Sequence, residues 1–292
     1  MSTIRTMVRG VYDIQKLRIQ MGNRIVMNYK SKLGQEPSMP ESELGSEEKK
    51  IIDLMRINYK KITDGVIGDL PSKKNFKGNE VISEYSELCL IDQYLGLEQS
   101  ELKSFKQLEK SLHDYPIYTE FLKNVKGCGA AMSGVIISEF DIHRSRYASS
   151  LWKYAGLDVV HVQDGENIVE EGRGRKKAHL VESTYKDSEG NEKTKVGITF
   201  NPFLKTKLVG VLAASFLKCK SPYSDIYYNY RNRLDNHTKH KDKTKLHKMN
   251  MSKRYMIKRF LVDLYTNWRA LEGLEVHPEY SEGKLGIVHS GD

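Results

Sequence analysis

Residues 121–139 read FLKNVKGCGAAMSGVIISE, and this stretch predicts a helix, a tight glycine turn and a second helix. Gly127 and Gly129 permit a sharp turn and leave backbone N–H groups uncovered. Such groups, at the positive end of a helix dipole, form a site for anions. Val125 and Ile136 are apolar and can pack the two helices together. The pattern is typical of a helix-hairpin-helix that holds a nucleic-acid phosphate; the alternative is a glycine cap between two core helices.

The basic charge is concentrated in one part of the chain. The 292 residues carry a formal net charge of +9. From Lys205 to Arg259 there are fifteen Lys and Arg residues against three acidic residues, whereas the rest of the chain has a small acidic excess. A local excess of this kind is the electrostatic footprint of a protein that binds a polyanion. The alternative is a solvated Lys-rich loop beside an ordinary helix.

Cysteine usage and hydropathy narrow the class of protein. Cys89, Cys128 and Cys219 are odd in number and widely spaced, which indicates a reducing cytosol and neither a disulfide framework nor a zinc site. The His-rich stretch 237–247 lacks the further ligands of a metal site. No apolar run reaches the length of a membrane span, and the first residues lack the core of a secretory signal. We therefore expect no metal, no cofactor, no membrane association and a cytoplasmic location.

The order of elements predicts a mainly α fold with a small β-meander insertion. Apolar residues spaced by three and four over 8–25 and 81–112, and a helix from Ser46 to about Thr63, indicate a helical, coiled-coil-like half at 1–115 that mediates self-association. A domain with the glycine turn follows at 116–235, and its β insertion lies near 158–199. A basic linker and C-terminal helix occupy 236–272, and a tail follows at 273–292.

The later part of the chain supplies further candidates. Strands are expected around 159–162, 180–185 and 194–198, with a hairpin turn at 187–191. Helix resumes near Pro202 with a buried face that includes Leu204, Leu208 and Phe216. Tyrosines between 223 and 230 are candidates for base stacking, and core packing is the alternative. The last helix, 251–271, is expected to turn its cations outward.

The candidate nucleic-acid-binding residues come from the glycine turn, the exposed part of the β insertion and the last helix. They are Lys126, Gly127, Cys128, Gly129, Ala130, Arg173, Arg175, Lys176, Lys177, Lys253, Arg254, Lys258 and Arg259. We assign no catalytic residue. Gly127→Val is expected to weaken DNA binding without unfolding the protein.

The order of elements from Phe121 to about Arg233 resembles the C-terminal transposase domain of the Piv/MooV-type insertion-sequence recombinases. These include the bridge-RNA-guided transposases and a pilin-gene invertase. Three segments carry the resemblance. They are the glycine turn leading into VIISEFD at 135–141, LWKYAGL at 151–157, which is similar to the family's AxYAGL segment, and the set GI at 197–198, LKTKL at 204–208, SPY at 221–223 and YY at 227–228.

Departures from the family pattern bear on activity. Full members begin with a RuvC-like domain, in which four acidic residues on an α/β fold hold metal ions, and residues 1–115 show no such alternation of strands and helices. The family's nucleophilic serine after AGL is replaced by HVQDG at 161–165, and its basic SKRG run by TFNP at 199–202. The resemblance therefore implies a DNA-handling domain that has lost its chemistry and that acts in the bacterial nucleoid or in a phage-infected cell. The N-terminal helices resemble the family's coiled-coil region, where subunits pair.

Together these observations predict a non-catalytic DNA-binding protein, related to a transposase domain, that acts as an accessory or regulatory factor in bacterial or phage DNA recombination. One form would be a recombination directionality factor that binds an integrase. Expected partners are DNA, with RNA as an alternative ligand, a recombinase or integrase, and a second copy of the chain. Two other hypotheses stay open: a minimal transposase or invertase that exchanges DNA strands, and a helical protein-interaction module.

Overall fold

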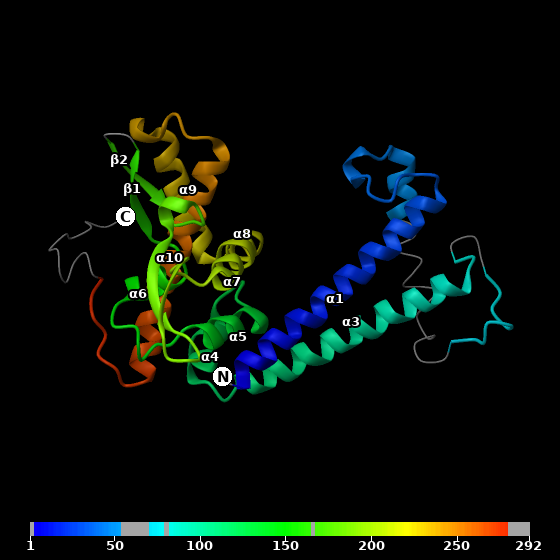
Figure 1. Cartoon of the computed structure of the whole chain (residues 1–292), viewed down its shortest axis with the longest axis horizontal. Coiled ribbons are helices and arrows are strands. Elements are labelled where there is room, and N and C mark those ends of the chain that lie inside the picture. Colours follow the sequence, from blue (N-terminus) through cyan, green and yellow to red (C-terminus); the bar gives the residue numbers. More distant parts are fainter. Residues whose placement is uncertain (1–2, 54–69, 79–81, 165–166, 280–292) are drawn as a thin grey trace. The chain divides into compact units, whose positions relative to one another are not determined.

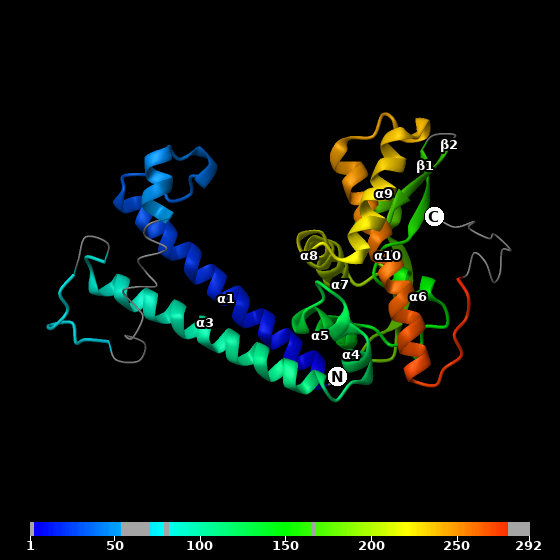
Figure 2. The same cartoon turned by 180° about the vertical axis from the view of Figure 1, so that it is seen from behind.

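The computed structural model describes the chain except for residues 1–2, 54–69, 79–81, 165–166 and 280–292. It is mainly helical with two small antiparallel sheets, which confirms the predicted fold class (Figures 1 and 2). Contacts between residues divide the chain into two compact units. One comprises Thr6–Leu108; the other comprises residues 2–5 and the chain from Glu109 onward. The finer segments 116–235, 236–272 and 273–292 stay predictions.

The first unit is built on two long helices, α1 (Thr3–Lys32) and α3 (Tyr85–Leu112), which lie side by side in both views (Figures 1 and 2). Ile25 of α1 meets Leu88 and Ile91 of α3 in a cluster of buried residues, which Ile82, just before α3, completes. Polar contacts cross the pair farther along. The side chain of Gln15 donates to Glu101 Oε1 at 2.8 Å. The spacing of three and four that predicted these helices therefore also supplies the faces that pack.

Two shorter helices lie between α1 and α3 in the sequence. The 3-10 helix η1 spans Glu41–Glu43, and a helix begins at Ser46 and runs to residue 53 within the described part of the chain. Tyr29, Leu44 and Ile52 form a second apolar cluster here. The helix start at Ser46 is as predicted, and its continuation to Thr63 lies outside the described residues.

The second unit contains the remaining helices. They are α4 (Pro116–Glu120), η2 (Leu122–Asn124), α5 (Ala130–Glu139), α6 (Ala148–Tyr154), η3 (Lys177–His179), α7 (Pro202–Lys205), η4 (Thr206–Leu212), α8 (Ala213–Cys219), α9 (Pro222–Asn236), η5 (Thr238–His240) and α10 (Lys245–Leu271). α10 packs against α4, α6, α8 and α9. Phe260 of α10 contacts the rings of Phe216 and Tyr223, with centroids 5.4 and 5.5 Å apart. The core of this unit therefore surrounds α10.

Helix α10 begins six residues before the predicted helix 251–271. The Thr244 hydroxyl accepts a hydrogen bond from the His247 amide at 3.2 Å, which caps the first turn. The last part of the expected Lys/His-rich linker, His237 to Lys248, is therefore helical. Apolar residues at helical spacing, including Met256, Phe260 and Leu264, form the buried face as predicted.

The helix expected from Pro202 is present as three joined stretches, α7, η4 and α8. Asn201 caps it by accepting the Leu204 amide at 3.1 Å, and Pro202 occupies the first turn, where no N–H is needed. η4 has π-helical geometry. Leu204, Leu208 and Phe216 of the predicted face are buried.

The strands form two separate hairpins rather than one continuous meander. β1 (Val159–Asp164) pairs with β2 (Asn167–Gly172), and β3 (Val181–Lys186) pairs with β4 (Glu192–Gly197). β2 was not predicted. The turn at 187–191 is confirmed, because Asp187 Oδ1 accepts the amides of Glu189 and Asn191, both at 2.9 Å. All residues of β3 are exposed, so hydrogen bonds across the turn and ladder hold this hairpin, and no core covers it.

In the part of the chain that is described, no helix is long and apolar enough to span a bilayer.

Candidate nucleic-acid interface

The glycine turn lies between a broken first helix and α5. α4 has five residues and is followed by the 3-10 turn η2, because Phe121 leaves helical geometry with φ −125° and ψ −66°. The continuous helix predicted before the glycine turn is therefore absent, and the chain forms α4 and η2 there. α5 then begins at Ala130, with Gly129 at its N-cap. The helix-hairpin-helix interpretation itself stays a prediction.

Gly127 packs against α8. Its φ is +94°, and a Cβ added there would lie 3.0 Å from Cδ1 of Phe216. The Ser215 hydroxyl donates to the Gly127 carbonyl at 2.8 Å. The structure argues against our expectation that Gly127→Val would spare the fold, because a branched side chain would meet Phe216 in a backbone conformation that L residues rarely adopt.

Cys128 is a structural residue of the turn rather than a ligand contact. Its side chain is buried, with 4% of the residue exposed, and burial raises the pKa of its thiol to about 11. Its amide donates to the Val125 carbonyl at 2.9 Å. The buried side chain of Cys128 and its already bonded N–H argue against the predicted role of Cys128 in nucleic-acid binding.

The amides that remain available are those at the start of α5. Gly129 is exposed, and no side chain caps the helix. Within the described part of the chain, the amides of Gly129, Ala130 and Ala131 have no acceptor, and the side chain of Lys126 is exposed with no acidic partner. Uncapped amides at a helix N-terminus next to a lysine favour an anion. Three of the five residues predicted at this turn, Lys126, Gly129 and Ala130, are thus placed where an anion can reach them.

The cations of the β insertion differ from one another. Arg175 and Lys177 are exposed. Lys176 is also exposed and forms an ion pair with Glu171 at 2.9 Å. Arg173 does not lie in the exposed part, contrary to the prediction: only 12% of its side chain is exposed, and its guanidinium holds both carboxylate oxygens of Asp158. Arg173 is only partly exposed because it and Asp158 flank the β1–β2 hairpin, and the pairing of the two strands brings them opposite each other.

The four cations of α10 that were predicted to face solvent do so only in part. Lys253 and Arg259 are partly exposed, and Arg259 pairs with Glu279. Arg254 lies against the backbone of Gly172, so that a Cβ there would be 1.5 Å from its Nη1. The Lys258 ammonium lies 5.2 Å from the Trp152 ring centroid. Arg254 and Lys258 are therefore half-buried between α10, the β1–β2 hairpin and α6, because the hairpin covers this side of the helix.

These contacts assemble a cationic cluster, which we define as Arg173, Lys205, Arg254 and Lys258 around the carboxylate of Asp158. Lys205 was not among the predicted site residues. It follows Leu204 on α7, and its ammonium donates to the Arg173 carbonyl and lies 4.7 Å from the Phe200 ring centroid. The sequence did offer a signal for Lys205: this lysine directly follows Leu204, on the apolar face formed with residues 208 and 212, so it could be expected to be partly buried.

Charge and burial both act on this cluster. Burial lowers the pKa of Lys205 to about 8, and the positive charge of Arg254 adds to the effect. Burial likewise lowers the pKa of Arg254 and of Lys258, which the charge of Asp158 only partly offsets. Asp158 is already held by Arg173, so one carboxylate faces four cations. Three of the predicted residues, Arg173, Arg254 and Lys258, thus meet in this cluster. Among the described residues, no hydrogen bond or ion pair joins them to the glycine turn.

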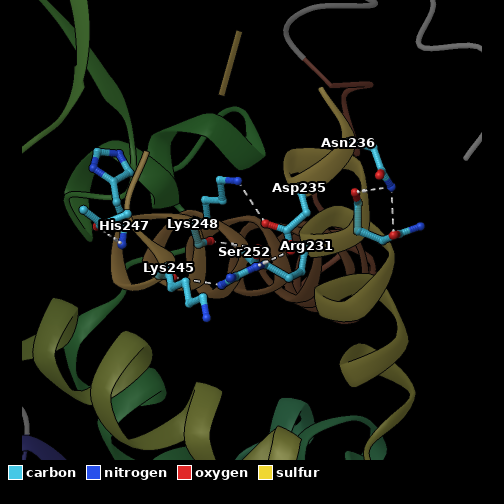
Figure 3. Close-up of polar contacts among 9 residues, drawn as sticks. Arg231, Asp235, Asn236, Lys245, His247, Lys248 and Ser252 are labelled. Carbon is cyan, nitrogen blue, oxygen red and sulfur yellow. Dashed lines mark hydrogen bonds and ion pairs between the residues drawn. The ribbon is translucent and has the colours of Figure 1, made fainter. Parts of the chain in front are cut away.

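The α9–α10 hairpin, residues 222–271, presents more cations at its tip. Asp235 fastens the two helices by accepting from Arg231 at 2.9 Å and Lys248 at 3.0 Å, as Figure 3 shows. Arg231 also donates to the Lys245 carbonyl at 2.9 Å. The tip lysines, Lys239, Lys241 and Lys245, are exposed and have no acidic partner in the described part of the chain. Asp235 is therefore used to hold the hairpin and does not pair with the tip lysines.

Some tyrosines of α9 pack in the core, and one is exposed enough to stack on a base. Tyr223 stacks on Phe216 with centroids 5.0 Å apart, and its hydroxyl donates to Asp263 at 2.6 Å. Tyr230 stacks on Tyr255 at 4.2 Å. These two rings are used in packing, whereas Tyr228 is 58% exposed. Base stacking therefore stays a prediction for Tyr228.

Comparison with known proteins leaves the family open. No protein-family model matches this chain, and no curated protein sequence matches it. The resemblance to the transposase domain therefore stays a hypothesis from the residues themselves.

Proposed function

We propose that this chain is a nucleic-acid-binding protein that contacts the phosphate backbone through its second unit. The observation that carries the proposal is the set of cations along the α9–α10 hairpin that have no acidic partner among the described residues. They comprise the exposed tip lysines and the half-buried Arg254 and Lys258. Each cation that neutralises a phosphate releases condensed counterions, which supplies binding free energy at physiological salt.

The uncapped amides of α5 support the same ligand class. Backbone N–H groups bind phosphate without reading bases, so the start of α5 would add a positioning contact to the charge of α10. With the resemblance to a transposase domain, these features favour a non-catalytic DNA-binding factor in bacterial or phage recombination. DNA is the ligand that this resemblance favours.

The experiment that tests the proposal compares two triple variants of equal charge change. Lys239, Lys241 and Lys245 are replaced by Gln in one, and Lys103, Lys106 and Lys110, exposed residues of α3, in the other. Binding to fluorescent duplex DNA, single-stranded DNA and single-stranded RNA is followed by anisotropy from about 50 to 300 mM salt, a range that spans counterion release. We expect the tip variant to weaken binding and to flatten the salt dependence by roughly 0.9 in log–log slope for each phosphate that is no longer neutralised.

The control variant should bind as the wild type does. Equal weakening in both variants would show that only total charge matters. Wild-type protein that binds none of the three nucleic acids at low salt would refute the proposed function. The order of affinities among the three ligands identifies which one the protein prefers.

A further inference from the structure

The cationic cluster around Asp158 has more positive charge than its own carboxylate can neutralise. Arg173 saturates Asp158, with Nε 2.9 Å from both oxygens and Nη2 at 2.8 Å. Lys205 donates to a backbone carbonyl. In the described part of the chain, Arg254 and Lys258 have neither a hydrogen-bond acceptor nor an ion-pair partner for their side chains. Two cations are thus without an acceptor, and a third has only a neutral one.

The neighbouring groups do not supply the missing charge. Glu171 on β2 is already paired with Lys176 at 2.9 Å and lies 3.1 Å from His179. The ammonium of Lys205 lies 4.7 Å from the Phe200 ring centroid, and that of Lys258 lies 5.2 Å from the Trp152 ring centroid. A ring face offsets only part of the cost of removing an ammonium from water.

The arrangement also keeps the guanidinium of Arg254 in one place. Because Gly172 has no side chain, Nη1 of Arg254 can lie where the Cβ of any other residue would be. Trp152 donates to the Lys258 carbonyl at 3.2 Å, which ties α6 to this turn of α10. Cations from the end of β2, from α7 and from α10 are therefore held close together by the fold, against their mutual repulsion.

We propose that this cluster is a binding site for a phosphate group, with Arg254 as the fork that binds two oxygens and Lys205 and Lys258 as flanking point charges. Arginine and lysine in a partly desolvated site bind phosphate through charge-assisted hydrogen bonds. The inference rests on the proposed function for its favoured source, a nucleic-acid phosphodiester. A free phosphate or a phosphorylated small molecule has the same chemistry.

The test uses the full-length protein and four substitutions. Arg254→Gln removes the fork, and Gly172→Ala displaces it while every charge is kept. Lys253→Gln is the matched control for the cluster. Lys253 was also predicted to contact nucleic acid, but it is the neighbouring residue on α10 and no contact joins it to the cluster in the described residues, so its loss removes one charge outside the cluster. Lys205→Met removes the titrating lysine. Circular dichroism first establishes that each variant is folded.

Inorganic phosphate is the first probe, at constant ionic strength with chloride as reference. We expect it to raise the unfolding temperature of wild type and of Lys253→Gln, and to leave Arg254→Gln and Gly172→Ala unshifted. Duplex DNA is the second probe, and its affinity should fall about tenfold in Arg254→Gln, the value of one charge-assisted interaction, and less than about threefold in Lys253→Gln. If phosphate shifts all variants equally, the proposed site is refuted.

The two probes separate the site from the proposed function. If DNA binds and its affinity falls equally in Arg254→Gln and Lys253→Gln, the cluster is not a phosphate site although the protein binds nucleic acid. If phosphate binds at the cluster and no nucleic acid binds to wild type, the site stands with a small phosphorylated ligand, and the proposed function fails.

A pH series gives a third readout. Lys205 faces Arg173, Asp158 and Arg254, and its pKa of about 8 means that it loses its proton near that pH. A bound phosphate would stabilise the charged form, so phosphate affinity should fall as the pH rises through the pKa of Lys205. Lys205→Met should abolish that dependence. An identical pH profile in wild type and Lys205→Met would remove Lys205 from the site.

Discussion

The two glycines of the turn have different surroundings, and their substitution should therefore differ in cost. Gly127 has φ +94° and meets Phe216, whereas Gly129 has φ −75° and nothing within 4 Å of an added Cβ. Gly127→Ala should lower the free energy of unfolding by about 1–3 kcal/mol. Gly129→Ala should cost less than about 1 kcal/mol, since it changes only an N-cap. Urea unfolding followed by circular dichroism measures both, and equal costs would contradict the packing role of Gly127.

Lys205 provides a prediction on pH and stability. Its folded-state pKa is about 8 against an ordinary 10.5. The unfolded chain therefore binds more protons between pH 8 and 10.5, and the contribution of this group to stability rises with pH across that window. Replacing Lys205 by Met should remove the effect. Between neutral pH and pH of about 10 the wild type should gain about 1–2 kcal/mol over the variant, a value that discounts the full linkage for partial exposure.

Urea unfolding at a series of pH values across this window measures the difference between the two proteins. Because other lysines and tyrosines titrate equally in both, they cancel in the comparison. A difference that stays constant with pH would show that the environment of Lys205 does not disfavour its charge.

The start of α5 can be tested by removing one amide without breaking the helix. Ala130 is the first helical residue, where proline is tolerated because its missing N–H has no helical partner. Gly129 has ψ 172°, which suits a residue before proline. If this helix end binds phosphate, Ala130→Pro should reduce DNA affinity by about tenfold, the value of one hydrogen bond to a charged group.

Ala130→Ser is the matched control, since it keeps the amide. Anisotropy at one salt concentration measures both variants, and thermal unfolding verifies that α5 is intact. Equal affinity of the two variants would place the start of α5 outside the interface.

Whole elements were predicted well where periodicity alone determines them. The apolar spacing in 251–271 gave the buried face of α10, and the turn at 187–191 followed from its Asp, Gly and Asn residues. The ends of elements, and one whole strand, were predicted less accurately. α10 starts earlier because Thr244 caps it, and β2 escaped prediction because its residues show no clear alternation between apolar and polar.

The chain as a whole joins its N-terminus to the second unit. Residues 3–5 belong to that unit, and Arg5 forms an ion pair with Glu139 at 3.1 Å. The side chain of Glu139 is fully buried and also accepts from Asn201 at 2.6 Å. Arg5→Ala would leave this carboxylate less well paired and should destabilise the second unit by about 1–3 kcal/mol.

Tryptophan fluorescence reports this effect selectively. Both tryptophans, Trp152 and Trp268, belong to the second unit. Lys16→Ala, at an exposed residue of α1 in the first unit, serves as the control and should leave the fluorescence transition in place. If Arg5→Ala also leaves it unchanged, the N-terminal residues do not stabilise the second unit.

The helical class, the amphipathic faces, the β hairpin turn at 187–191 and the concentration of basic charge could be read from the sequence, because each depends on local spacing or on composition. Which cations face one another, in contrast, depends on how the elements pack. Arg173, Lys205 and Arg254 lie in three distant segments and meet because the β1–β2 hairpin and α7 pack beside α10. The direction and surroundings of a side chain depend on the neighbouring element, and no local pattern carries that information.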